Sequence, residues 1–125
     1  MKTTNTTRRI LIVDDEDDLR ELLSQVLHTQ GYEVQSAING EEAIALLTHQ
    51  SFDLALLDIQ MPKINGIQVL RHIRENSPST KAIMLTGYAD LKNAMEASEF
   101  GAQDFISKPY KLDDVLSTIR RVLNQ

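Results

Sequence analysis

The chain has 125 residues, 42% of them hydrophobic and 25% charged, a composition typical of one globular domain. The absence of cysteine excludes a disulfide scaffold and thiolate metal sites, and no apolar run is long enough to span a membrane. With a formal net charge of -5 and no signal-peptide pattern, we expect a cytoplasmic protein that does not bind nucleic acid or membrane directly.

Predicted strands and helices alternate along the chain. Residues 1–7 are polar and rich in threonine, which predicts a flexible N-terminal tail before one domain over residues 8–125. Hydrophobic runs predict strands over residues 10–13, 54–58, 82–85 and 104–107. Residues 33–37 alternate around Val34, which predicts a strand with one weaker face near an edge of the sheet. Apolar residues at helical spacing predict helices over residues 19–27, 40–47, 67–76, 91–100 and 112–123. The expected inner face of the first helix consists of Leu19, Leu22, Leu23, Val26 and Leu27. This alternation predicts an α/β fold: a doubly wound, five-stranded parallel sheet with five helices on both faces.

The stretch from Leu54 to Pro62 places one acid at the end of a buried strand. Its four apolar residues in a row are typical of a parallel strand that is covered on both faces. Met61 and Pro62 end the strand, because proline cannot donate a hydrogen bond to a neighbouring strand. Asp58 is therefore expected at a carboxyl end, where open α/β sheets keep their ligand sites. A carboxylate that merely caps a turn is the alternative.

Polar residues also follow the other predicted strands. Asp14 and Asp15 follow the first, Thr86 the fourth and Lys108 the fifth. In a doubly wound sheet these residues and Asp58 meet at one edge. A run of five acids can equally be a solvated face that opens a helix. Because Asp14 and Asp15 come directly after a buried strand, we favour the arrangement in which they meet Asp58 at the edge of the sheet.

Carboxylates that converge at one edge of the sheet repel one another unless positive charge lies nearby. Two like charges about 4 Å apart repel by about 1 kcal/mol in water and about 4 kcal/mol at an effective dielectric of about 20. Lys108 offsets one charge, and a divalent cation with oxygen ligands offsets more; an open site with few protein ligands suits Mg²⁺. A carboxylate beside Mg²⁺, a lysine and a hydroxyl can accept a phosphoryl group by in-line attack, which forms an acyl phosphate.

This ordered set resembles the receiver domain of bacterial two-component response regulators, and the likeness extends from Arg8 to Leu123. The residues that carry it are the acid pair Asp14-Asp15, the loop from Asp58 through Met61-Pro62 to Gly66, then Thr86, and Lys108-Pro109. A chemotaxis member of this family has the flavodoxin-like fold, so the resemblance implies the strand order 2-1-3-4-5.

The resemblance implies how the chain would take up a phosphoryl group. A sensor histidine kinase or phosphotransfer protein would phosphorylate Asp58, and Lys108 would pair with the phosphoryl group. Asp15 and Asp58 would bind Mg²⁺ together with the backbone carbonyl of Gln60, while Asp14 would assist through water. The chain would catalyse only its own phosphorylation and slow dephosphorylation, and in that sense would not be an enzyme.

The same resemblance implies a switch. Thr86 would hydrogen-bond the phosphoryl group, and Phe105, at a position where tyrosine is common, would turn inward behind it. The fourth helix, fifth strand and fifth helix would then present an altered surface to a partner or output domain, or to a second copy in a phosphorylation-dependent homodimer. The Lys108-Pro109 bond would be cis. Gln60 and Tyr88 resemble positions that set the lifetime of the phosphoryl group; simple surface polarity is the alternative.

Three other functions compete with this interpretation. A phosphatase of the haloacid-dehalogenase type also uses an aspartyl nucleophile with Mg²⁺, but needs an acid two residues on, where this chain has Gln60. A flavin carrier shares the fold but needs a phosphate-binding loop after the first strand, where Asp14 to Asp18 would repel phosphate. A third alternative is a docking module that works without phosphorylation. The sequence is also compatible both with a stand-alone regulator and with one end of a longer protein.

Overall fold

A computed structural model describes residues 7–87 and 98–125 of the chain. Its strands are β1 (Arg9–Val13), β2 (Glu33–Ala37), β3 (Leu54–Asp58), β4 (Lys81–Thr86) and β5 (Asp104–Ser107). Its helices within those ranges are α1 (Asp17–Thr29), α2 (Gly40–His49), α3 (Gly66–Asn76) and α5 (Leu112–Leu123). The predicted tail over residues 1–7 and the predicted helix over residues 91–100 fall largely outside the described residues.

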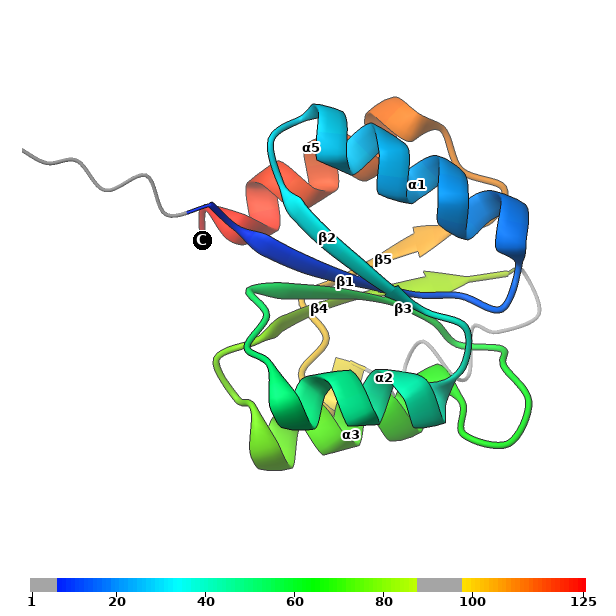
Figure 1. Ribbon diagram of the computed structural model, residues 1–125, viewed down its shortest axis with the longest axis vertical. Coiled ribbons are helices and arrows are strands. Elements are labelled where there is room, and N and C mark those ends of the chain that lie inside the picture. Colours follow the sequence, from blue (N-terminus) through cyan, green and yellow to red (C-terminus); the bar gives the residue numbers. More distant parts are fainter. Residues whose placement is uncertain (1–6, 88–97) are drawn as a thin grey trace, which may run out of the picture.

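The five strands form one parallel sheet in the order β2-β1-β3-β4-β5, which confirms the predicted fold. Helices α1 and α5 cover one face of the sheet, and α2 and α3 cover the other (Figure 1). The register places Val13 of β1 beside Leu57 of β3, and Thr86 of β4 beside Ser107 of β5. The residues that follow these strand ends therefore meet at one edge of the sheet.

The hydrophobic run in β3 is explained by a core on each side of the sheet. Leu54 and Leu56 pack into the cluster formed with α1 and α5, whereas Ala55 and Leu57 pack into the cluster formed with α2 and α3. Successive side chains of a strand point to opposite faces, so a strand with both faces covered is apolar throughout. The edge strand β2, with Glu33 exposed, has a weaker pattern, as its alternating sequence predicts.

Local side-chain hydrogen bonds define the start of two helices. The side chain of Asn39 accepts a hydrogen bond from the backbone N–H of Glu42 at 2.8 Å, at the start of α2. At the start of α3, Asn65 accepts from the N–H of Gln68 at 3.0 Å, and the Gln68 side chain accepts from the N–H of Asn65 at 2.9 Å. This reciprocal capping box starts α3 eight residues after Asp58 and so bounds the loop between them.

Helix α1 departs from its predicted inner face at one residue. Leu23 and Leu27 are buried against the sheet, but Leu22, also expected to face inward, is 43% exposed. Neighbouring residues on a helix lie about 100° apart, so the sheet covers Leu23 and leaves Leu22 toward solvent. Within the described part of the chain, no helix combines the length and apolar character needed to cross a membrane.

Candidate functional site

Three strands deliver charged side chains to the carboxyl edge of the sheet. Asp14 follows β1, Asp58 ends β3 and Lys108 follows β5. The Lys108 Nζ atom lies 3.1 Å from Asp58 Oδ2 and 3.2 Å from Asp14 Oδ2. The side chains of Asp14 and Asp58 are 0% and 7% exposed. A buried carboxylate is stable only when it is paired and hydrogen-bonded, and Lys108 provides that pairing for both.

Each buried carboxylate is also held by the loop that follows it. Asp14 Oδ1 accepts a hydrogen bond from the N–H of Glu16 at 2.9 Å, and Asp58 Oδ1 accepts from the N–H of Gln60 at 3.1 Å. Both are turns in which an aspartate side chain bonds the backbone two residues on, a local preference of this residue type. Each carboxylate thus directs one oxygen to its own loop and the other to Lys108.

The loop after β3 is packed too closely to admit extra atoms. A Cβ atom added at Gly66 would lie 2.3 Å from the carbonyl oxygen of Asp58, and one at Gly40 would lie 2.5 Å from the carbonyl oxygen of Ile64. Lys63 within this loop adopts a φ of 64°, in the left-handed region that side chains rarely occupy. The two glycines therefore allow α2 and α3 to hold the loop that carries Asp58 in place.

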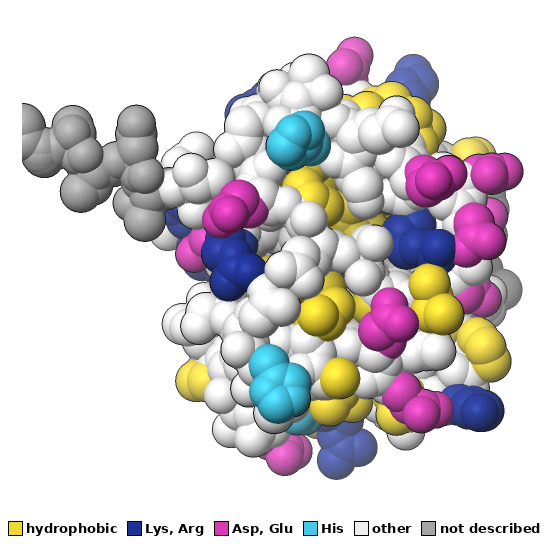
Figure 2. All heavy atoms as spheres, in the orientation of Figure 1, with side chains coloured by type: hydrophobic (Ala, Val, Ile, Leu, Met, Phe, Trp, Pro, Cys, Tyr) yellow, Lys and Arg dark blue, Asp and Glu magenta, His cyan; other side chains and the backbone are white. Residues whose placement is uncertain are grey.

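The acidic side chains form a group that suits a hard cation. Carboxylate oxygens of Asp14, Glu16 and Asp58 all lie within 4.8 Å of one another. Figure 2 shows further acidic side chains gathered at the end of the molecule where α1 begins, and the first turn of that helix contains Asp17 and Asp18. Oxygen ligands in a negative field are the donor set that Mg²⁺ prefers, so the residues present fit this ion.

The cluster differs in one member from the predicted metal ligands. Asp15 is exposed and does not belong to the group of three, whereas Glu16, which the sequence analysis did not single out, does. The turn at Asp14 brings the Glu16 side chain to within 3.4 Å of Lys108 Nζ. The available signal was the Asp14-x-Glu16 spacing inside the acidic run, because an aspartate often bonds the backbone two residues later.

Burial and charge set the protonation of the site. Burial raises the pKa of Asp58 to about 6, against the opposing effect of Lys108, and the neighbouring Asp14 adds to the rise. Burial by itself lowers the pKa of Lys108, but Asp58 and Asp14 raise it to well above its ordinary value. Burial, followed by the charge of Asp14, raises the pKa of Tyr110 to about 12. Near neutral pH the site therefore combines a charged lysine, a neutral phenol and an unusually basic aspartate.

The remaining predicted residues lie around this cluster. Thr86 is buried, and its hydroxyl donates a hydrogen bond to the carbonyl of Gly87 at 3.1 Å. Phe105 is partly buried against the core cluster between the sheet and α3. The Lys108-Pro109 bond is cis, the isomer that the resemblance implies. Tyr88 lies outside the described residues.

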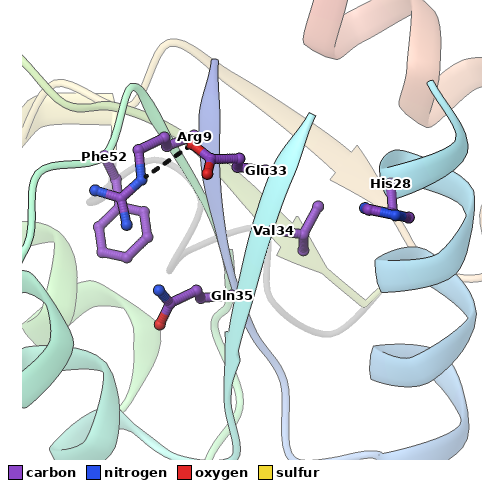
Figure 3. Close-up of a pocket in the computed structure, with 6 residues that line it drawn as sticks. All are labelled: Arg9, His28, Glu33, Val34, Gln35 and Phe52. Carbon is purple, nitrogen blue, oxygen red and sulfur yellow. Dashed lines mark ion pairs between the residues drawn. The ribbon is translucent and has the colours of Figure 1, made fainter. Parts of the chain in front are cut away.

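A separate hollow of about 220 Å³ lies at the opposite end of the sheet (Figure 3). Its lining consists of Arg9, His28, Glu33, Val34, Gln35 and Phe52. Arg9 pairs with Glu33 at 3.7 Å, and its guanidinium lies 5.1 Å from the centre of the Phe52 ring. Because Arg9 and Glu33 begin β1 and β2 while the acidic cluster follows the strand ends, this hollow is not part of the acidic site.

Comparison with known proteins identifies similar chains. Residues 10–120 match the family model of the response regulator receiver domain. The chain is 41% identical over 115 residues to regulatory protein AtoC of Escherichia coli, and 40% identical over 125 residues to transcriptional regulatory protein ResD of Bacillus subtilis. These matches span 92% and 100% of this chain, but only 25% of AtoC and 51% of ResD.

Solved structures agree with the fold. A CheY-like receiver domain protein from Methanospirillum hungatei is 37% identical, with a TM-score of 0.91 over 95% of each chain. The receiver domain of NtrX from Brucella abortus is 32% identical, with a TM-score of 0.87 over 93% of this chain and 98% of that one.

Proposed function

Since this chain belongs to the family of response regulator receiver domains, we propose that Asp58 is its phosphorylation site in a two-component phosphorelay. The observation that carries the proposal is the bridge from Lys108 to two buried carboxylates, which come from separate strands. One oxygen of Asp58 is held by the Gln60 N–H, and the other faces the lysine that would stabilise an incoming phosphoryl group.

The acidic cluster would hold Mg²⁺ in this reaction. Asp14, Asp15, Asp58 and the carbonyl of Gln60 are its proposed ligands; of these, Asp14 and Asp58 lie in the oxygen cluster that also contains Glu16. When bound, the ion would supply positive charge that stabilises the transferring phosphoryl group. The raised pKa of Asp58 fits the proposal as well, because a more basic carboxylate is a better nucleophile.

Phosphorylation would act as a switch through residues that now have other partners. Lys108 would exchange the Asp58 carboxylate for the phosphoryl oxygens, and the Thr86 hydroxyl would leave the Gly87 carbonyl for the same group. Phe105, only partly buried at present, would turn into the space that Thr86 vacates. Such a change follows only if the phosphoryl group makes better contacts in the switched state.

The proposed partners follow from the family. A sensor histidine kinase or phosphotransfer protein in the cytoplasm would supply the phosphoryl group. The switched surface, which includes β5 and α5, would act on an output domain or target protein, or pair with a second copy. Two of the relatives are named as regulatory proteins that extend well beyond the matched region, which fits an output of this kind. Gln60 and Tyr88 are proposed to tune the lifetime of the aspartyl phosphate.

Phosphorylation of Asp58 can be tested directly by mass spectrometry. Treatment with acetyl phosphate and MgCl₂ should add one phosphoryl group to the peptide that contains Asp58. Chelation of Mg²⁺ or the substitution Asp58→Asn should abolish the addition, whereas Asp113→Asn, which removes an exposed carboxylate on α5, should not. Addition at another residue would refute the proposal. No addition at all would refute it in favour of a docking module that works without phosphorylation.

A further inference from the structure

Lys108 has a third partner that differs from the other two in exposure. Its Nζ atom lies 3.4 Å from Glu16 Oε1, and the Glu16 side chain is 60% exposed. Asp14 and Asp58, by contrast, are buried partners of the same ammonium group. Glu16 is therefore the carboxylate of the cluster that faces the solvent from which small donors arrive.

The Glu16 side chain has no structural role in α1 that would explain this position. It occupies the N-cap of the helix, yet its side chain makes no capping hydrogen bond. Its backbone is used instead: the N–H donates to Asp14 Oδ1 at 2.9 Å, and the carbonyl accepts from the N–H of Arg20 at 3.0 Å. Glu16 and Lys108 also line a hollow of about 350 Å³ beside the site, so a molecule that approaches the lysine from this side passes close to the Glu16 carboxylate.

We propose that Glu16 selects among small phosphodonors by their charge, an inference that rests on the proposed phosphorylation of Asp58. Its exposed carboxylate both repels an anionic donor at the mouth of the site and competes with it for Lys108. Coulomb repulsion grows in proportion to the donor's charge, so a doubly charged donor is slowed more than a singly charged one. Glu16 thus acts as a specificity-determining residue and is not the nucleophile.

Two small donors differ in charge and leaving group, and acetyl phosphate is the larger of the two. Acetyl phosphate is a dianion at neutral pH: an Asp58 oxygen bonds to phosphorus, the bond from phosphorus to the acetate oxygen breaks, and acetate leaves with the electron pair. Phosphoramidate has a protonated nitrogen and one net negative charge: the same bond to Asp58 forms, the bond from phosphorus to nitrogen breaks, and ammonia leaves. Both reactions yield the same aspartyl phosphate without any further reactant.

The test compares phosphorylation rates of Glu16→Gln with those of the unsubstituted protein, with each donor at saturating Mg²⁺. Glu16→Gln should increase the rate with acetyl phosphate relative to the rate with phosphoramidate by about threefold to tenfold. High salt should reduce this difference, because Glu16 is exposed and its field is screened. The matched control is Glu21→Gln, which removes an exposed carboxylate of α1 that lies outside the cluster and should leave the rate ratio unchanged.

The outcomes separate this inference from the proposed function. If the unsubstituted protein takes a phosphoryl group on Asp58 from either donor but Glu16→Gln leaves the rate ratio unchanged, only the selection by Glu16 is refuted. If Glu16→Gln slows both donors and weakens Mg²⁺ affinity measured by titration, Glu16 is a metal ligand and the inference is wrong. If neither donor labels Asp58, the proposed function fails together with the inference.

Discussion

At the scale of single residues, Lys108 forms ion pairs with three carboxylates of the acidic site. One ammonium group compensates two buried carboxylates and one exposed carboxylate, so negative charge remains in excess. Burial, with a smaller contribution from the charge of Asp14, raises the pKa of Asp58 from an ordinary 3.8 to about 6. A group held in an unfavourable charge state lowers the stability of the fold, and this provides a test that does not depend on phosphorylation.

We predict that Asp58→Asn stabilises the metal-free protein by about 1–3 kcal/mol near pH 7. The folded-state pKa of Asp58 lies above the unfolded-state value, so the folded state binds more protons between about pH 4 and pH 6. The free energy of unfolding of the unsubstituted protein therefore falls as pH rises through this window, and the advantage of Asp58→Asn grows. Urea denaturation at several pH values, in a chelator, measures the difference.

Glu75→Gln is the control for this measurement, because it removes an exposed carboxylate of α3. Its effect on the free energy of unfolding should stay within about 0.5 kcal/mol at every pH. Equal stability of Asp58→Asn and the unsubstituted protein at pH 7 would show that the buried charge is fully compensated.

Among the elements, the junction between β3 and α3 leaves no room for a side chain at Gly66. A Cβ atom at Gly66 would lie 2.3 Å from the Asp58 carbonyl oxygen, so we predict that Gly66→Ala destabilises the fold by roughly 2–4 kcal/mol. The matched control is Gly31→Ala, where φ is +96° but no atom lies within 4 Å. That substitution strains only the backbone and should destabilise by about 1 kcal/mol. A thermal melt of both variants tests this order; equal losses would contradict it.

The capping box of α3 provides a second prediction at this scale. Asn65→Ala removes the acceptor for the Gln68 N–H and should reduce the free energy of unfolding by about 1 kcal/mol. Because Asn65 begins α3 beside the loop that follows Asp58, amide exchange in residues 59–66 should also accelerate. Asn76→Ala, at the far end of the same helix, is the control for a general loss of helix stability. Faster exchange in that variant as well would mean that the cap does not act locally.

For the molecule as a whole, Mg²⁺ should act as a stabilising ligand. A cation that binds only the folded state at about a hundred times its dissociation constant adds about 2.7 kcal/mol. We therefore expect MgCl₂ to raise the melting temperature of the unsubstituted protein, and to do so much less for Asp14→Asn, which replaces a buried carboxylate of the cluster with a neutral amide. NaCl at equal ionic strength controls for screening of the net charge of -5. An identical shift with NaCl would argue against a specific site.

The amino-acid sequence by itself determined the elements and the edge at which the polar residues meet. Short continuous runs of apolar residues identify the buried strands, and apolar residues that recur about every 3.6 positions identify the helices. Both patterns can be read from residues that are close together in the sequence. The alternation of strand and helix then restricts the topology to a parallel sheet, so Asp14, Asp58 and Lys108 had to end at one edge. The strand order itself came from the family resemblance, since the pattern of elements allows more than one order.

Only the tertiary structure decided which acid of the run faces Lys108 and how deeply each is buried. Asp14 and Lys108 are 94 residues apart in the chain, and no local pattern measures their separation. Glu16, and not Asp15, lies in the carboxylate cluster because the backbone turns after Asp14. The hydrogen bond from the Glu16 N–H to the Asp14 side chain holds this turn. The raised pKa of Asp58 likewise arises from its burial at the end of β3, which lies between β1 and β4, because desolvation depends on everything packed around a charge and not on its neighbours in sequence.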